Sequence, residues 1–338
     1  DGSDLHISVG APVKIRAGGS VQSITTEDLP VDVTEQMLRE IVSPERWQHY
    51  LETKDLDFAY EIDGLARFRG SYLYNHWGMA AVFRQIPANI LSFDDLNLPE
   101  VLQQVCEYKE GLVLVTGPTG SGKSTTLAAM INLIARARQC HVVTIEDPIE
   151  FLFQDDKATI SQREVGTDTP TFHEALRNCM RQDPDVIMVG EMRDLETMAT
   201  AITAAETGQL VFSTLHTNNA AQTVDRIIDS YPSDQQLQVR GQLALVLKAI
   251  VSMQLVEDSE GKDRLPACEI LVNAPKISKH IENGEIKEIL EEMENSVNFY
   301  HMQSMNQSLI SLLAHNKITY EQAVDLSLIH ISEPTRPT

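Results

Sequence analysis

The segment Gly117–Ser124 constrains the fold of this chain more than any other part of the sequence. It reads Gly-Pro-Thr-Gly-Ser-Gly-Lys-Ser and fits the phosphate-binding pattern G-x-x-x-x-G-K-[ST]. An apolar run, Gly111–Thr116, precedes it, and a stretch with helical spacing, Thr125–Ile131, follows it. The motif needs this context, because its glycines turn backbone N–H groups onto phosphates at a helix N-terminus. The alternative, a Gly/Ser-rich turn that matches by chance, is disfavoured by the flanking strand and helix.

Each residue type in this loop has an expected role. Lys123 is expected to reach the β- and γ-phosphates of ATP, and the Ser124 hydroxyl is expected to ligate Mg²⁺. The residues that we expect to bind the nucleotide are Gly117, Pro118, Thr119, Gly120, Ser121, Gly122, Lys123, Ser124 and Thr125.

The surrounding sequence predicts an α/β fold with a parallel sheet. Apolar runs without alternation suit parallel strands that are buried on both faces. The stretches between these runs have helical spacing, for example Thr171–Arg181 and Glu196–Thr207. Such alternation is typical of a doubly wound sheet. The four apolar runs are Leu112–Thr116, His141–Ile145, Val186–Val189 and Leu210–Thr214.

The pattern changes along the chain and predicts two domains. Residues 1–90 read as a mixed α/β domain, residues 91–110 as a linker, and residues 111–325 as the nucleotide-binding domain. The first domain is expected to contain a helix over 34–42 and a meander of strands over 56–62, 66–73 and 78–86. Beyond about Val256 the pattern predicts helices alone, over 276–283, 286–294 and 304–316.

The two ends of the chain are expected to depart from the natural protein in different ways. The chain does not begin with Met, so we expect that an N-terminal piece is missing. Residues 326–338 break the helical pattern and resemble a translated sequencing adapter, so we expect a non-native tail there; a natural Pro-terminated tail is the alternative.

Composition narrows the classes of partner. The formal net charge is −22, from 27 basic and 49 acidic residues, which disfavours a nucleic-acid partner. No apolar run approaches the roughly 20 residues of a membrane helix, so direct membrane insertion is not expected. The four cysteines form no C-x-x-C, which disfavours a zinc site and a disulfide framework. Reduced thiols in the cytoplasm are the simplest interpretation.

Three further segments place polar residues where predicted strands end. Glu146–Glu150 puts three carboxylates at the edge where ligands of such sheets bind, and a carboxylate there can orient and deprotonate water. Glu191 ends an apolar strand and can hold the Mg²⁺ shell or polarise water. His216 follows the fourth run as a candidate sensor of the γ-phosphate. The alternatives are a solvated acidic loop, an incidental surface carboxylate and a structural histidine.

Arginines of the first domain form the last candidate group. Arg67 and Arg69 fall on one strand face by their spacing of two, and Arg84 follows on the next strand. Arginine suits phosphate oxygens because its planar fork offers paired donors. Ordinary surface charge is the alternative.

With these motifs together, the chain resembles the PilT/PilU-type retraction ATPases of type IV pili, a branch of the secretion-ATPase superfamily. The resemblance runs from about Gly2 to Asp325 and includes the phosphate loop, the acidic box Glu146–Glu150 and the motif Leu215–Asn218. It further includes Ser161–Gly166, Arg181–Asp185 and Thr207-Gly208.

The resemblance implies a PAS-like N-terminal domain, a RecA-like ATPase domain with a helical C-terminal part, and a homohexamer. It implies Glu150 as the catalytic carboxylate, Glu191 as the Walker B acid and His216 as the His-box residue. Arg69 and Arg84 match positions expected to reach the γ-phosphate, and Arg67 is a further candidate.

Two departures bear on the branch. Extension-type ATPases carry a tetracysteine zinc element, and its absence here favours retraction. Where PilT-type sequences carry Ala-Ile-Arg-Asn-Leu-Ile, this chain has Ala274-Pro275-Lys276-Ile277-Ser278-Lys279-His280-Ile281, which is closer to PilU, as is Ile318–Ala323. The choice between PilT and PilU type stays open.

The expected function is an ATP-hydrolysing motor that powers pilus retraction and twitching motility. Expected partners are five further copies, the inner-membrane platform protein of the pilus and a paralogous retraction ATPase. The expected location is the cytoplasm, at the inner membrane through a protein partner. The alternatives are another secretion-superfamily motor, a nucleic-acid motor, a PilU-like accessory subunit, or an accessory subunit that binds nucleotide without hydrolysing it.

Overall fold

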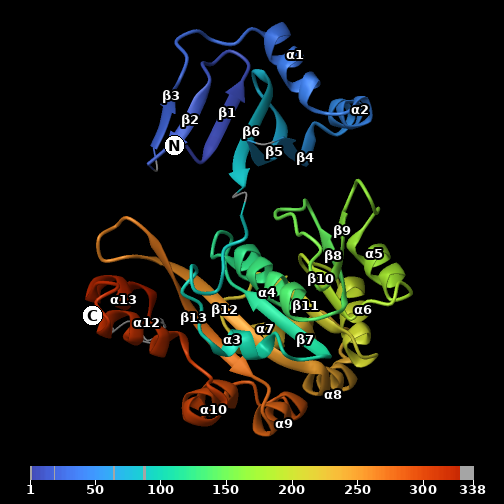
Figure 1. Cartoon of the computed structure of the whole chain (residues 1–338), viewed down its shortest axis with the longest axis vertical. Helices are drawn as coiled ribbons and strands as arrows, with labels where there is room; N and C mark the ends of the chain where they lie inside the picture. Colours follow the sequence, from blue (N-terminus) through green and yellow to red (C-terminus); the bar gives the residue numbers. More distant parts are fainter. Residues whose placement is uncertain (1, 19, 64, 87–88, 328–338) are drawn as a thin grey trace. The chain divides into compact units, whose positions relative to one another are not determined.

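The computed structural model describes residues 2–18, 20–63, 65–86 and 89–327. The chain divides into two compact units (Figure 1). The first unit runs to Asn89 and includes Asp147–Leu152, and the second contains the other described residues. The predicted α/β class is confirmed, because both units combine sheets with helices. From residue 328 onward the expected non-native tail lies outside the described residues.

The first unit is built on a six-stranded antiparallel sheet with the order β3-β2-β1-β6-β5-β4. The meander predicted from alternation is confirmed as β4, β5 and β6, and the predicted helix is α1. The sequence analysis did not assign α2, which begins at a Ser43 cap and has Pro at its first position. The bounds are β1 Asp4–Ser8, β2 Lys14–Ala17, β3 Ser20–Ser23, α1 Val31–Ile41, α2 Pro44–Thr53, β4 Asp55–Ile62, β5 Ala66–Asn75 and β6 Gly78–Ile86.

Aromatic side chains fill the core of this unit. Phe58 and Tyr72 are fully buried, and their rings meet edge to face with centroids 4.8 Å apart. The Tyr72 hydroxyl donates a buried hydrogen bond of 2.9 Å to the carbonyl of Leu38 in α1. This bond satisfies the polar end of a buried tyrosine and ties the helix to the sheet. Gly70 lies against the Phe58 ring, where a Cβ would approach its carbon atoms to 2.6 Å.

The second unit is built on a seven-stranded sheet with the order β13-β12-β7-β11-β10-β8-β9 (Figure 1). All neighbouring strands are parallel except β13, which runs antiparallel to β12. The four strands predicted from apolar runs are confirmed as β7, β8, β10 and β11. The bounds are β7 Gly111–Thr116, β8 His141–Glu146, β9 Thr159–Glu164, β10 Val186–Val189, β11 Leu210–Leu215, β12 Leu247–Glu257 and β13 Arg264–Val272.

Helices cover both faces of this sheet, as the doubly wound pattern predicts. On β7, Leu112 and Leu114 join one buried cluster, whereas Val113 and Val115 join another. The first cluster includes α5 to α10, and the second includes α3 and α4. The helix bounds are α3 Val101–Val105, α4 Lys123–Ala137, α5 Phe172–Cys179, α6 Leu195–Glu206, α7 Ala220–Asp229, α8 Gln236–Val246, α9 Pro275–Asn283, α10 Glu288–Asn295, α11 Val297–Tyr300, α12 Met305–Ala314 and α13 Tyr320–Leu326.

The expectation of helices alone after Val256 is wrong. The strand β13 intervenes, and Glu257 pairs with Arg264 at the start of its ladder with β12. Pro266 lies within β13, a position that a sheet tolerates because β13 is an edge strand. The three predicted helices follow as α9, α10 and α12. The elements β3, β9, β12, α7 and α8 were also not assigned from the sequence.

We predict that Gly70→Ala destabilises the first unit by about 1–3 kcal/mol, because the Phe58 ring has no room to move within its aromatic cluster. Both tryptophans, Trp47 and Trp77, lie in this unit, so their fluorescence during urea unfolding reports on it. Gly241→Ala is the matched control, because nothing lies within 4 Å of its added Cβ. The control should leave the tryptophan transition unchanged. An unchanged midpoint for Gly70→Ala would contradict the proposed overpacking.

Candidate nucleotide site

The phosphate loop joins the end of β7 to the first residue of α4, as the motif requires. Three of its glycines have positive φ angles: +139° at Gly117, +81° at Gly120 and +91° at Gly122. A Cβ on Gly117 would lie 2.4 Å from the carbonyl oxygen of Met253 and 2.6 Å from Ser121 Oγ. The loop therefore needs glycine at its start for both space and backbone conformation.

The lysine of the loop is held inside it. Lys123 is buried, and its Nζ donates hydrogen bonds of 2.8 Å to the carbonyl oxygens of Gly117 and Pro118. The buried Ser121 hydroxyl oxygen has no hydrogen-bond partner among the described residues. A buried ammonium group and an unsatisfied hydroxyl beside a helix N-terminus suit a bound phosphate, whose oxygens accept from both. The loop therefore fits the nucleotide that its sequence predicts.

Two other predicted residues, Glu191 and His216, lie together at neighbouring strand ends. They follow β10 and β11, which pair in parallel, and Nε2 of His216 lies 3.6 Å from Oε2 of Glu191. The Thr214 hydroxyl donates a 2.6 Å hydrogen bond to the carbonyl of Gly190. This bond links the two strand ends directly, so the acid and the histidine belong to one site.

Sequence reasoning missed Arg193. Its Nε donates to Oε2 of Glu191 at 2.7 Å, although the side chain of Arg193 is 75% exposed. The sequence signal was an arginine two residues after the predicted acid, which spacing alone does not distinguish from surface charge. Glu191 thus carries a mobile cationic partner, whereas its own side chain is only 14% exposed.

The residues at this edge fit a magnesium ion. No group of three or more His, Cys, Asp or Glu side chains within the described residues is arranged to hold a metal. Mg²⁺ does not require one, because it takes one or two protein oxygens and completes its shell with phosphates and water. The exposed Ser124 hydroxyl and the Glu191 carboxylate supply oxygen donors of this kind.

The acidic box is divided between two environments. Glu146 is buried and accepts hydrogen bonds from the Thr144 hydroxyl at 2.7 Å and from the Gln162 amide at 3.3 Å, so its carboxylate is engaged within the sheet. Glu150 belongs to the segment grouped with the first unit, where its Oε1 lies 3.9 Å from Nη1 of Arg69. Glu146 and Glu150 therefore have different partners, and the role of each carboxylate of the acidic box stays a prediction.

The predicted arginines share one face of the first unit's sheet. Arg69 on β5 lies directly opposite Arg84 on β6, a register that the sequence spacing could not reveal. Arg67 donates to the carbonyl of Ile149 at 3.1 Å and pairs with Glu61 at 3.3 Å. Like charges on opposite strands repel, so each arginine needs a nearby acceptor.

Arg84 finds its acceptor in Asp4, at 2.7 Å. Burial by itself raises the pKa of Asp4, but hydrogen bonds from Ser3 and Arg84 and the charges of Arg84 and Arg16 lower the pKa below its usual value. Arg84 is nevertheless largely exposed, so the pair leaves its guanidinium accessible.

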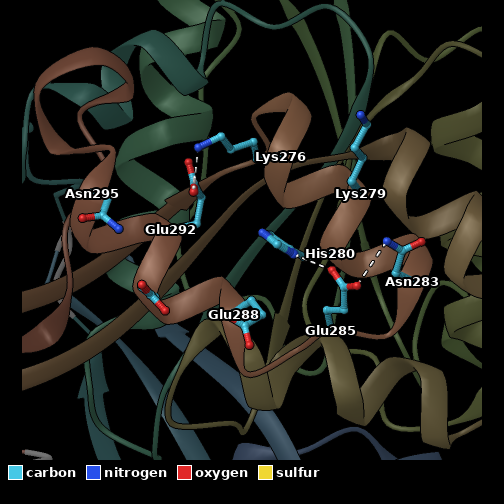
Figure 2. Close-up of a pocket in the computed structure, with 9 residues that line it drawn as sticks. Lys276, Lys279, His280, Asn283, Glu285, Glu288, Glu292 and Asn295 are labelled. Atoms are coloured by element: carbon cyan, nitrogen blue, oxygen red, sulfur yellow. Dashed lines mark hydrogen bonds and ion pairs between the residues drawn. The ribbon is translucent and has the colours of Figure 1, made fainter.

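A cavity of about 390 Å³ lies elsewhere, between α9 and α10. Figure 2 shows its lining, in which Lys276 pairs with Glu292 and His280 pairs with Glu285. Glu288 and Glu291 add further carboxylates, which would repel phosphate groups. None of the residues predicted to bind nucleotide lines this cavity, so it is not the nucleotide site.

The sequence analysis did not expect direct insertion of this chain into a membrane. Within the described ranges, no helix combines the length and the apolar character that crossing a membrane requires.

The phosphate loop between a central parallel strand and a helix, with an acid and a histidine at the adjoining strand ends, defines the class of P-loop nucleoside triphosphatases. Residues 53–325 match the family model described as "Type II/IV secretion system protein". The chain is 41% identical to the type IV pilus retraction ATPase PilT of Pseudomonas aeruginosa, over 95% of this chain and 93% of that protein. It is also 41% identical to the type IV pilus ATPase PilU of the same organism, over 96% of this chain and 84% of that protein.

Solved structures agree with the sequence matches. A crystal structure of the pilus retraction motor PilT with bound ADP superposes with a TM-score of 0.89 at 42% identity, covering 97% of this chain and 93% of that one. The chain belongs to the type IV pilus retraction ATPases of the type II/IV secretion family. It is an ATPase with a PAS-like N-terminal domain and a RecA-like ATPase domain, as predicted.

We predict that Gly117→Ala weakens ADP binding by about 10- to 100-fold, because the added Cβ forces strain of about 1–3 kcal/mol into the loop. Calorimetric titration with ADP measures the effect. Gly120→Ala is the comparison, since its φ is +81° but nothing lies within 4 Å of its added Cβ. It should weaken binding less. Equal losses for the two variants would mean that contact with Met253 does not limit the loop.

Proposed function

We propose that this protein is a magnesium-dependent ATP-hydrolysing motor that works as a ring of six and powers retraction of type IV pili. The observation that carries the proposal is the phosphate loop, with Lys123 buried inside it and Glu191 and His216 at neighbouring strand ends. Family membership supports the motor function. The PilT relatives named above are described as a retraction ATPase and as a retraction motor.

In this proposal Glu150 is the catalytic carboxylate that orients the attacking water and takes its proton. Nη1 of Arg69 lies 3.9 Å from Oε1 of Glu150, a distance at which the guanidinium can help to orient the carboxylate. Glu150 is about one third exposed, which leaves it accessible to water. Glu146 is less suited to the role because it is buried and its Oε1 already accepts two hydrogen bonds inside the sheet.

The remaining residues bind and sense the nucleotide. Residues 117–125 hold the phosphates, Ser124 ligates Mg²⁺ directly, and Glu191 holds the ion through water. When bound, Mg²⁺ neutralises charge on the β- and γ-phosphates. His216 senses the γ-phosphate from beside Glu191. Arg69 and Arg84 act on the γ-phosphate with their guanidinium groups, and Arg67 supports them.

The partner in this proposal is the cytoplasmic part of the pilus platform protein at the inner membrane. The net charge of −22 makes attraction to anionic lipid or to DNA unfavourable, so a protein partner must recruit the motor. Charge complementarity predicts a basic contact surface on that partner. A paralogous retraction ATPase is the second proposed partner.

A PilU-like accessory subunit is the second candidate function. The observation that favours it is the sequence of α9, where Ala274–Ile281 departs from the PilT-type signature. The identities to PilT and PilU are both 41%, so overall similarity does not separate the two. Complementation of pilus retraction in strains that lack either protein distinguishes them.

We predict that Glu150→Gln binds MgATP but hydrolyses it about 10²–10⁴-fold more slowly, because the amide keeps the shape and loses the base.

Lys123→Ala should instead lose tight nucleotide binding, with turnover lower by about 10²–10³-fold. Steady-state ATPase assays and nucleotide titration measure both effects. The exposed Glu288→Gln on α10 is the control and should turn over normally. If Glu191→Gln stopped turnover while Glu150→Gln did not, the base would be wrongly assigned.

We further predict a six-membered assembly in MgATP that captures the platform's cytoplasmic domain, with binding that weakens as salt rises. Mass photometry measures the assembly, and a pull-down across a salt series measures capture, with double-stranded DNA as a parallel bait. A stable monomer at micromolar concentration would contradict the ring. Capture of DNA at physiological salt without capture of the platform would favour a nucleic-acid motor.

A further inference from the structure

A carboxylate lies buried in the edge strand β13 without a basic partner. Glu269 is 2% exposed, and burial raises its pKa while hydrogen bonds from the backbone N–H groups of Ala220 and Met305 oppose that rise. No basic side chain in the described part of the chain forms an ion pair with it. Burying a carboxylate carries a large desolvation cost unless hydrogen bonds satisfy its oxygens. The hydrogen bond from Ala220 therefore offsets part of that cost.

The backbone N–H of Ala220, the first residue of α7, donates to Oε1 of Glu269 at 2.7 Å. The positive end of the α7 dipole therefore lies against the carboxylate, which accepts from an N–H group that the helix leaves unpaired. The side chain joins α7 to the C-terminal helices through β13.

The α12 side of this junction is fixed independently to β13. Ile270 and Gln303 exchange two backbone hydrogen bonds of 2.7 and 3.0 Å just before α12 begins. The Gln303 amide also donates to the carbonyl of Cys268 at 2.7 Å. The start of α12 is therefore held against β13 by contacts that do not involve the Glu269 side chain. The contact that depends on Glu269 is the one with α7.

The α7 side leads directly to the nucleotide site. Ala220 lies four residues after His216, and side chains tie the intervening turn to α7. The Thr217 and Thr223 hydroxyls are 2.7 Å apart, and the Thr223 hydroxyl donates to the carbonyl of Asn219 at 2.7 Å. These contacts tie the turn after His216 to the first part of α7, and Nε2 of His216 lies 3.6 Å from Oε2 of Glu191.

We propose that Glu269 is a positioning residue for ATP hydrolysis, which ties the start of α7 to β13 and thereby holds His216 beside Glu191. It touches neither nucleotide nor metal and acts through α7. The inference rests on the proposed function, in which His216 acts at the γ-phosphate. It adds a residue outside every motif of the sequence and makes the contact between β13 and α7 a condition for turnover.

The test is a double-mutant comparison of kcat and KM for MgATP in the whole protein. Glu269→Gln keeps the size but replaces a carboxylate with a neutral amide, which accepts more weakly from the N–H of Ala220 and loses the charge that the start of α7 favours. We expect kcat to fall on the order of 10- to 100-fold, as a small misplacement of a catalytic group does, with KM unchanged. His216→Ala should also lower kcat. In the His216→Ala background, Glu269→Gln should cause no further fall, because both act on one group.

The matched control is Ser308→Ala. Its buried hydroxyl accepts a 3.0 Å hydrogen bond from the N–H of Cys268, so it removes a comparable β13–α12 contact without touching α7. It should lower the melting temperature but leave kcat unchanged. If Glu269→Gln does not fold, Glu269→Asp carries the same comparison, and circular dichroism with ADP titration checks each variant.

An equal fall in kcat from the Glu269 variant in both backgrounds would overturn the inference, as would an unchanged kcat in the wild-type background. An unchanged kcat for His216→Ala would remove His216 from the chemistry and the inference with it. That result would still be separate from the ATPase assignment, which Lys123→Ala tests.

Discussion

The close approach of the end of β7 to the middle of β12 is the constraint on which the rest of the site depends. The carbonyl of Met253 leaves no space for a Cβ on Gly117, and one residue earlier the Thr116 hydroxyl donates to the Ser252 hydroxyl at 2.9 Å. The phosphate loop starts from this junction. β7 is held between two parallel neighbours, so the strand that leads into the loop is in place before the nucleotide binds. Donors that are positioned in advance need no reorganisation when the phosphate arrives.

In a chain with a net charge of −22, the partners of individual carboxylates matter for the site. Glu191 is held by Arg193, Glu150 lies near Arg69, and Glu269 accepts from the first N–H group of α7. Two of these partners are arginine side chains, and the third is a backbone N–H group. The exposed arginines can leave their carboxylates and donate to phosphate oxygens instead. The backbone N–H groups are fixed in their helix and cannot change partner in this way. Glu191 and Glu150 are thus suited to a changing site, and Glu269 to a permanent junction.

The order of strands in the second unit explains why its functional residues come from distant parts of the sequence. Parallel strands bring their carboxyl ends to one edge, so Glu191 after β10 and His216 after β11 become neighbours. The cavity between α9 and α10 is separate in composition as well as in lining. Its carboxylates suit it to basic groups, and it lies where the sequence departs from the PilT-type signature.

The sequence by itself determined the phosphate loop, the parallel strands that precede its motifs and the family, because these depend on local patterns: glycine spacing, continuous apolar runs and short ordered motifs. It did not reveal β13 or the helices α7 and α8, whose burial comes from partners far along the chain. Only tertiary structure decided the register that sets Arg69 opposite Arg84, the contact of Arg193 with Glu191, and the contact of Glu269 with the start of α7. Each is a meeting of charged or polar groups that are many residues apart or individually unremarkable, and such meetings are specified by packing of the whole sheet rather than by any local spacing.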